Sequence, residues 1–218
     1  MLTAFSHIIF DLDGVLLDTE PLYTQATQAV VGEFGRTFDW SIKGDMIGRS
    51  AMDGARYLKQ KLDLPIEAEE YLRRRTPILE GLFETAPEMP GARSLVAGLS
   101  ARGVPLGLAT SSDARQYRIK TSRHDWFAQF KVVLCGDDPR LGALKPAPDI
   151  FLLTAKELGC APESCLVFED SLAGVTAARA AGMQVIAMPD PNMDASRYTQ
   201  ASLVVESLQD FDFSVLGL

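Results

Sequence analysis

The sequence predicts an α/β protein, with a doubly wound parallel sheet as its core and an α-helical cap domain inserted into that core. Two observations carry this prediction. Short apolar runs recur along the 218 residues with helical stretches between them, which is typical of a parallel sheet wrapped by helices. The long interval before the second run, which begins at Val104, holds amphipathic helical patterns instead of a strand.

Six short apolar runs are expected to form the strands of the sheet. They are residues 7–10 (HIIF), 104–109 (VPLGLA), 131–135 (KVVLC), 165–168 (CLVF), 183–188 (MQVIAM) and, more weakly, 202–206 (SLVVE). Because helical patterns separate these runs, the strands indicate a Rossmann-like sheet with parallel order.

Three of the helices between the strands have a recognisable end. Residues 91–102, 148–158 and 172–181 are followed by Gly103, Gly159 and Gly182 in turn. Glycine readily adopts the left-handed backbone conformation that closes a helix. These glycines therefore indicate where the three helices stop.

The interval after the first strand contains four predicted amphipathic helices, at residues 22–34, 41–46, 51–62 and 67–83. The proline-containing segments DTEPLY and TAPEMPGA flank them and are natural hinges. We therefore expect residues 19–88 to form a helical cap. Residues 1–18 and 89–218 are expected to form the α/β catalytic core from both ends of the chain.

Composition limits the class of protein. The net charge of −8 at pH 7 disfavours broad binding to nucleic acid or to an anionic membrane. No apolar run approaches the roughly 18 residues that a membrane span needs, and no secretory leader opens the chain. Cys135, Cys160 and Cys165 lack paired zinc spacing and are expected to be buried thiols of a reducing compartment. We expect a cytoplasmic protein without nucleic-acid or membrane partners.

Polar residues follow four of the predicted strands. They are Asp11 with Asp13, then Thr110 with Ser111 and Ser112, then Lys145, and finally Glu169 with Asp170. In open α/β sheets, ligands bind beyond the carboxyl ends of the strands, so these residues are candidates for one site. Taken singly, each group has a plain structural explanation as a turn, a helix N-cap or a solvated loop residue.

Together the four groups have a more specific chemistry. Carboxylates without neighbouring histidine or cysteine suit a hard cation such as Mg²⁺, which is commonly shared with a substrate phosphate. A lysine and hydroxyl groups are suitable partners for the phosphate itself. The set therefore indicates a magnesium and phosphate site.

Four stretches resemble the sequence motifs of the haloacid dehalogenase-like hydrolases that carry a helical cap. They are DLDGVLLDT, LATSSD, KPAPDIF and FEDSLAGV, in the same order and with similar spacing. The resemblance covers nearly the whole chain. It implies Mg²⁺-dependent hydrolysis of a small phosphomonoester, either a sugar phosphate or a nucleotide-like metabolite.

The resemblance also implies roles for the residues at the strand ends. Asp11 would be the nucleophile that forms an aspartyl-phosphate, and Asp13 the general acid and base. Asp11, the backbone carbonyl of Asp13 and Asp170 would hold Mg²⁺, with Glu169 as a ligand or beside the ligands. The Thr110 hydroxyl, the Ser111 N–H group and Lys145 would bind the phosphoryl oxygens.

The acid role of Asp13 carries an expectation about its pKa. An aspartate with the ordinary pKa of about 3.9 is protonated about one time in a thousand at pH 7. The charge of Asp11 and of the substrate would raise the pKa of Asp13. We therefore expect Asp13 to titrate well above Asp11.

The cap is expected to select the leaving group. Arg49 is a candidate substrate-binding residue, whereas Lys43, Lys59 and Lys61 are expected to be solvated helix lysines. A hexose-phosphate mutase of the β-phosphoglucomutase type shares the motifs, but Tyr23 stands where such mutases carry histidine. A non-catalytic binding module on the same scaffold is the other alternative. Stretches such as MPGARSL and AAGMQVIAMPD are similar to the pseudouridine-5'-phosphatase group of the family.

Overall fold

The computed structural model describes residue 2, residues 4–46 and residues 50–209 of the chain. Six parallel strands form one sheet with the order β3-β2-β1-β4-β5-β6. The strands are β1 (His7–Phe10), β2 (Leu106–Ala109), β3 (Val132–Leu134), β4 (Cys165–Glu169), β5 (Gln184–Ala187) and β6 (Leu203–Val204). All six predicted strands are present, and the doubly wound sheet is confirmed.

Helices cover both faces of the sheet. The core helices are α5 (Ala92–Ala101), α6 (Ala114–Thr121), α7 (Asp149–Leu158) and α8 (Leu172–Ala180), with short 3₁₀ turns at η1 (Asp125–Gln129), η2 (Pro162–Ser164) and η3 (Ala195–Arg197). Helices α5, α7 and α8 overlap the three predicted ones, and Gly159 follows α7 with a φ of +79°.

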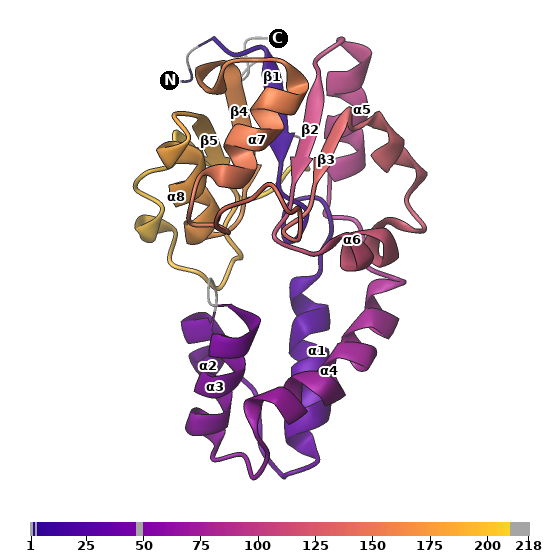
Figure 1. The fold of residues 1–218 in the computed structure, drawn as a ribbon, viewed down its shortest axis with the longest axis vertical. Helices are drawn as coiled ribbons and strands as arrows, with labels where there is room; N and C mark the ends of the chain where they lie inside the picture. Colours follow the sequence, from indigo (N-terminus) through magenta and orange to yellow (C-terminus); the bar gives the residue numbers. More distant parts are fainter. Residues whose placement is uncertain (1, 3, 47–49, 210–218) are drawn as a thin grey trace.

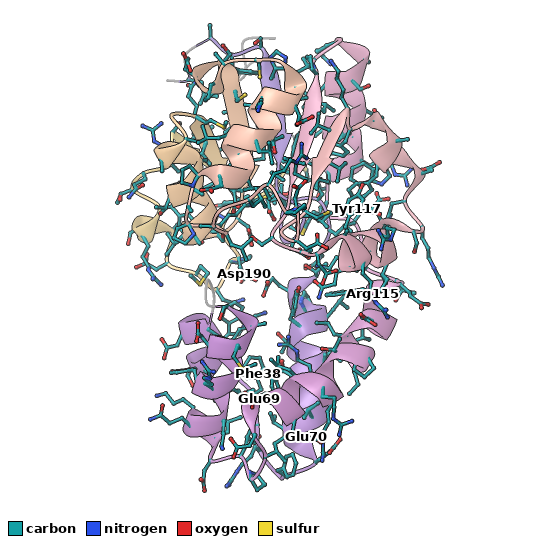
Figure 2. All side chains as sticks on the ribbon, viewed as in Figure 1. Phe38, Glu69, Glu70, Arg115, Tyr117 and Asp190 are labelled. Carbon is teal, nitrogen blue, oxygen red and sulfur yellow. The ribbon has the colours of Figure 1, made fainter. Side chains whose placement is uncertain are left out.

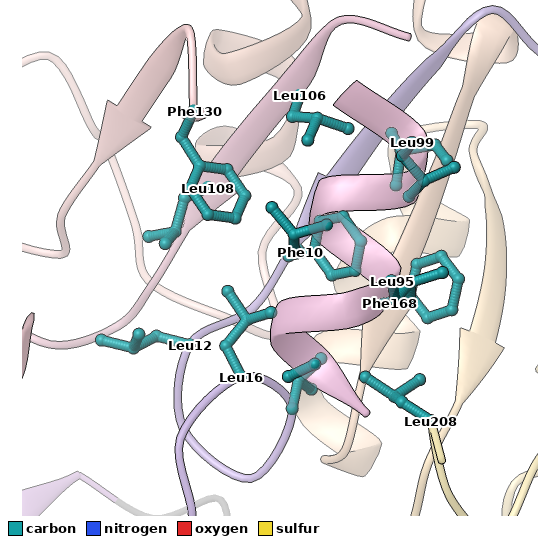
Figure 3. Packing of buried hydrophobic residues seen from close by; sticks show 14 of the residues in the cluster. Phe10, Leu12, Leu16, Leu95, Leu99, Leu106, Leu108, Phe130, Phe168 and Leu208 are labelled. Carbon is teal, nitrogen blue, oxygen red and sulfur yellow. The ribbon is translucent and has the colours of Figure 1, made fainter. Parts of the chain in front are cut away.

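Alternate side chains of each strand enter two separate hydrophobic clusters. Phe10 of β1 packs with α5 and η1 on one face, where it stacks on Phe168 at a ring-centroid distance of 4.8 Å (Figure 3). Ile9 points to the other face and packs with α7 and α8. Since the period of a strand is two residues, the three apolar residues of β1, Ile8, Ile9 and Phe10, supply both clusters. Burial on both faces of the sheet thus explains why the strands appear in the sequence as continuous apolar runs.

Four helices lie between β1 and α5 in the chain and form the predicted helical cap. They are α1 (Glu20–Gly32), α2 (Trp40–Met46), α3 (Ala51–Leu62) and α4 (Ala68–Phe83). Figure 1 shows them beyond the ends of the strands, away from the helices that flank the sheet. They have a hydrophobic cluster of their own, in which the hydroxyl groups of Thr27 and Tyr71 are 3.0 Å apart. The division at residues 18 and 88 stays a prediction.

The two connections between cap and core run side by side. The Asp18 N–H group donates to the Pro87 carbonyl at 2.9 Å, and the Met89 N–H group donates to the Leu16 carbonyl at 3.0 Å. Glu88 in the second connection also accepts hydrogen bonds from Arg93 and from the Trp126 indole. Those contacts, Arg93 first, lower the pKa of Glu88 to about 2. The two connections that form the hinge are therefore joined by a ladder of hydrogen bonds.

Two further expectations from composition concern the cysteines and the membrane. Cys135, Cys160 and Cys165 are free thiols, of which only Cys165 is fully buried, so the expected burial holds for one of the three. Within residues 2, 4–46 and 50–209, no helix is both long and apolar enough to span a bilayer.

The packing of Gly91, the residue before α5, against the backbone of Leu208 can be tested by substitution. Gly91 has a φ of +86°, and a Cβ atom there would lie 2.2 Å from the Leu208 carbonyl oxygen. Gly103 has a similar φ of +73° with no atom within 4 Å of that position, so it is a matched control. We predict that G103A lowers the free energy of unfolding by about 1–2 kcal/mol, the cost of left-handed backbone. G91A should cost about 1–3 kcal/mol more because of the overlap.

Urea unfolding of both variants, followed by circular dichroism, measures the two losses. Equal losses would show that the backbone around Leu208 moves away without cost.

Candidate active site

Lys145 joins three strand ends in the interior of the core. Its ammonium group donates to Asp11 Oδ1 at 2.6 Å, to Glu169 Oε1 at 2.7 Å and to the Ala109 carbonyl at 3.0 Å. These partners belong to the ends of β1, β4 and β2. The side chains are buried, with exposed fractions of 5% for Lys145, 8% for Asp11 and 1% for Glu169. The structure thus brings these three predicted residues together.

Asp170 completes a cluster of three carboxylates with Asp11 and Glu169. One oxygen of each lies within 4.8 Å of the others. If all three are ionised, a single lysine leaves two negative charges uncompensated. An all-oxygen donor set with this charge fits a hard divalent cation.

The hydrogen bonds of the three carboxylates show which of their oxygens are still available to other groups. Glu169 is engaged at both oxygens, by Lys145 and by the Ser171 N–H and hydroxyl groups at 2.8 and 3.0 Å. Within the part of the chain that the structure describes, the Asp170 carboxylate and Asp11 Oδ2 accept no hydrogen bond. The Asp170 carboxylate is therefore available to an ion, Asp11 Oδ2 is free for an incoming group, and Glu169 orients the lysine.

The pKa values of the site residues reflect how close its negatively charged groups lie to one another. Burial raises the pKa of Asp11, and the nearby Glu169 and Asp13 add to the rise, against the attraction of Lys145. Burial likewise raises the pKa of Asp170, with Glu169 and Asp11 as further causes. For Lys145, burial acts to lower the pKa, but the two carboxylates outweigh it and the pKa is raised. The site thus combines a strongly basic lysine with carboxyl groups whose proton affinity is raised.

Two glycines make room for the carboxylates. A Cβ atom at Gly174 in α8 would lie 1.6 Å from Glu169 Oε1, and one at Gly14 would lie 2.4 Å from Asp170 Oδ2. Gly14 also has a φ of +73°. Both positions therefore need glycine if the carboxylates are to stay where they are.

Thr110 and Ser111 follow β2 next to the carbonyl that Lys145 contacts. Thr110 is buried, and its hydroxyl oxygen accepts the Ser112 N–H group at 3.0 Å, which leaves the hydroxyl proton free to donate. Ser111 is exposed, and its N–H group has no partner among the described residues. The two donors are thus available to an anion, and their phosphate-binding role stays a prediction.

Asp13 lies in a second network that sequence reasoning missed in part. Its Oδ1 accepts the Thr19 hydroxyl at 2.6 Å and the Lys120 ammonium at 2.6 Å. Its Oδ2 accepts the Ser112 hydroxyl and Lys120, both at 2.9 Å. Lys120 was not among the predicted site residues, because a lysine within a helix gives no signal by itself. The only clue is that it follows Ser112 by eight residues, about two helical turns.

The expected order of the two aspartate pKa values is wrong. Burial acts to raise the pKa of Asp13, but the charge and hydrogen bonds of Lys120 outweigh it, with help from Thr19 and Ser112, so the pKa is lowered. Asp11, by contrast, has a raised pKa. The reversal arises because each aspartate has its own lysine and only Asp11 shares that lysine with another carboxylate.

The cap adds charged residues at the junction. Lys43 is buried and paired with Glu20 at 2.9 Å, so the expectation of a solvated lysine is wrong at this position. Glu20 contributes to the raised pKa of Asp170 after burial, Glu169 and Asp11, so its charge acts on the core site. Figure 2 shows Asp190 on the core side of the junction. Arg49 lies outside the described residues.

Comparison with known proteins agrees with this geometry. A family model for the haloacid dehalogenase-like hydrolases matches residues 5–182. A probable pseudouridine-5'-phosphatase of Drosophila melanogaster is 42% identical, over 100% of this chain and 96% of its own length. A (DL)-glycerol-3-phosphatase 2 of Arabidopsis thaliana is 40% identical, over 99% and 92%.

Solved structures show the same architecture. A crystal structure of a conserved haloacid dehalogenase-like protein of unknown function from Agrobacterium tumefaciens has a TM-score of 0.84 and 26% identity, covering 98% of this chain and 99% of that one. A putative β-phosphoglucomutase from Thermotoga maritima has a TM-score of 0.79 and 29% identity, covering 98% and 97%. The chain belongs to the haloacid dehalogenase-like hydrolase family, as its four motifs predicted.

Proposed function

We propose that this chain is a Mg²⁺-dependent phosphatase that hydrolyses a small phosphomonoester through an aspartyl-phosphate on Asp11. The observation that carries the proposal is the Asp11 carboxylate itself. One of its oxygens is held by Lys145, the other accepts no hydrogen bond in the described structure, and the residue is part of the acidic cluster with Glu169 and Asp170. Such a carboxylate is fixed in orientation and has a free oxygen for attack. The chain is a phosphoric monoester hydrolase, as its family and the phosphatase names of its relatives indicate.

The first half of the reaction forms the aspartyl-phosphate. Asp11 Oδ2 attacks phosphorus, the bond from phosphorus to the ester oxygen breaks, and Asp13 gives a proton to that oxygen so that an alcohol leaves. Lys145 and the Thr110 hydroxyl would offset the charge on the other phosphoryl oxygens. Mg²⁺, held by Asp11, Asp170 and the Asp13 carbonyl with Glu169 beside them, would supply two further positive charges.

The second half releases phosphate. Water attacks phosphorus, the bond to Asp11 Oδ2 breaks, and Asp13 takes up the proton of the water. The lowered pKa of Asp13 suits this base role. For the acid role, the negative charge of the bound phosphate raises the proton affinity of Asp13, which takes up a proton from water before it passes that proton to the leaving oxygen.

The substrate class proposed here is a phosphorylated polyol or nucleoside of small size. The names of the two relatives near 40% identity, a glycerol-3-phosphatase and a probable pseudouridine-5'-phosphatase, support this class without choosing between its members. The Glu20–Lys43 pair at the junction offers both a donor and an acceptor for hydroxyl groups. A cytoplasmic site of action remains part of the proposal.

Removing the nucleophile tests the reaction. We expect Mg²⁺-dependent release of inorganic phosphate from p-nitrophenyl phosphate, and a loss in kcat of about 10⁴-fold or more in D11N, because no other group can form the covalent intermediate. D63N is the control, since Asp63 is an exposed residue at the end of α3 with a φ of 48° that asparagine also adopts. Equal activity of D11N and D63N would contradict the assignment of Asp11.

A substrate panel distinguishes the alternatives. Pseudouridine monophosphate, glycerol 3-phosphate and hexose phosphates, ranked by kcat/KM for phosphate release, are expected to identify one preferred class. Interconversion of hexose 1- and 6-phosphates without phosphate release would instead assign a mutase. Binding without turnover of any ester would assign a non-catalytic module.

Mg²⁺ binding is expected to depend on pH. The pKa of Asp11, raised to about 7, means that a proton must leave this carboxyl when the cation binds below pH 7. The apparent affinity should therefore fall at least about tenfold for each pH unit below 7, because the raised pKa of Asp170 adds a second proton that the cation must displace. In the metal-free protein, a raised folded-state pKa removes stability as pH rises from the ordinary value of 3.8 through about 7.

Thermal unfolding with and without saturating MgCl₂ measures this linkage. The rise in Tm caused by Mg²⁺ should be larger at about pH 8 than at about pH 5.5, and D170N should abolish it at both. A rise that is independent of pH would exclude Asp11 as a ligand.

A further inference from the structure

Lys120 is a lysine with a fully buried side chain that faces no solvent. The exposed fraction of the side chain is 0%. Its ammonium nitrogen lies 2.6 and 2.9 Å from the two oxygens of Asp13, 2.7 Å from the Ser112 hydroxyl and 3.4 Å from the Tyr23 hydroxyl. The three protons of the ammonium group are thus directed at Asp13 and the groups around it.

Aromatic rings from the cap close the other side of the ammonium group. Its nitrogen lies 4.2 Å from the ring centroid of Phe83 in α4 and 5.5 Å from that of Tyr23 in α1. Ile119, the neighbour of Lys120 in α6, also packs against the cap cluster of Ala26, Leu79 and Phe83. Lys120 therefore lies where core and cap meet and contacts both.

The stability of the fold does not by itself explain a buried ion pair of this kind. Taking both charges out of water costs about as much as their attraction returns, and apolar residues of similar volume often serve the fold as well or better. A position between Phe83 and Tyr23 could be filled by methionine or leucine. The lysine is instead matched to a single carboxylate, that of Asp13.

Four hydrogen bonds from three side chains define the orientation of the Asp13 carboxylate. Thr19 and Lys120 bind Oδ1, while Ser112 and Lys120 bind Oδ2, so the Lys120 ammonium bridges both oxygens. Rotation of the carboxylate would break at least one charged hydrogen bond. Positioning of this kind matters because a displacement of about 1 Å at a reacting group can cost about 100-fold in rate.

We propose that Lys120 is a positioning residue for Asp13, which fixes its carboxylate for proton transfer to the leaving group and from water. This inference rests on the acid and base role given to Asp13 under the proposed function. Within the described residues, the ammonium group has no hydrogen bond to Asp11, Glu169 or Asp170, so among the acidic residues of the site it contacts Asp13 alone.

A double-mutant cycle tests the inference. The wild type, K120M, D13N and the double variant K120M/D13N are assayed with p-nitrophenyl phosphate and Mg²⁺. We expect K120M to lower kcat by about 100-fold with KM changed by less than about threefold, because the phosphate-binding groups are untouched. In the D13N background, K120M should change kcat by no more than about twofold, since its target is gone.

K43M is the matched control. Lys43 is also buried and ion-paired, but its partner is Glu20 of the cap and it does not contact Asp13. Its effect on kcat should be the same factor, within about twofold, in the wild-type and D13N backgrounds. This control separates loss of a buried lysine in general from loss of the contact with Asp13.

Each remaining outcome has a defined meaning. If K120M lowers kcat by the same factor in both backgrounds, Lys120 acts through packing and the inference is overturned. If K120M does not fold, as judged by circular dichroism, the same cycle with K120Q, which also removes the charge, decides by the same criterion. If the wild type releases no phosphate in the presence of Mg²⁺, the proposed function itself is overturned, and the inference with it.

Discussion

The ion pairs of Lys145 with Asp11 and Glu169 are the interaction on which the rest of the site depends. Three carboxylates meet at the ends of β1 and β4 inside the protein, where their mutual repulsion is poorly screened. One buried ammonium group between two of them makes that arrangement possible. The close approach of Gly14 and Gly174 and the order of the strands all serve to bring these groups to one point.

The fold and the charged centre of the site could be predicted from the sequence for a physical reason. Strands buried on both faces leave long apolar runs, and parallel order sends every strand end to the same edge. Asp11, Lys145 and Glu169 therefore had to be neighbours once the strands were identified. The helix ends near Gly159 followed in the same way, because they depend on a local conformational preference.

What the sequence did not predict depends on tertiary contacts that leave no local pattern. Lys120 and Lys43 look like ordinary helix lysines, but the packing of cap against core buries Lys120, and packing within the cap buries Lys43. The order of the aspartate pKa values failed for the same reason. Asp11 and Asp13 are two residues apart, but their side chains enter different networks, and proximity in the chain says nothing about which cation each one meets.

The ladder between Leu16, Asp18, Pro87 and Met89 limits how the cap and the core can be arranged. The chain crosses between core and cap twice, and the two crossings lie side by side. The cap is therefore attached along one line and not at two separate points. An attachment of this form favours rotation of the cap about the line over sliding across the sheet. Because Asp13 precedes the first crossing in the chain, its place relative to the two crossings belongs to the core.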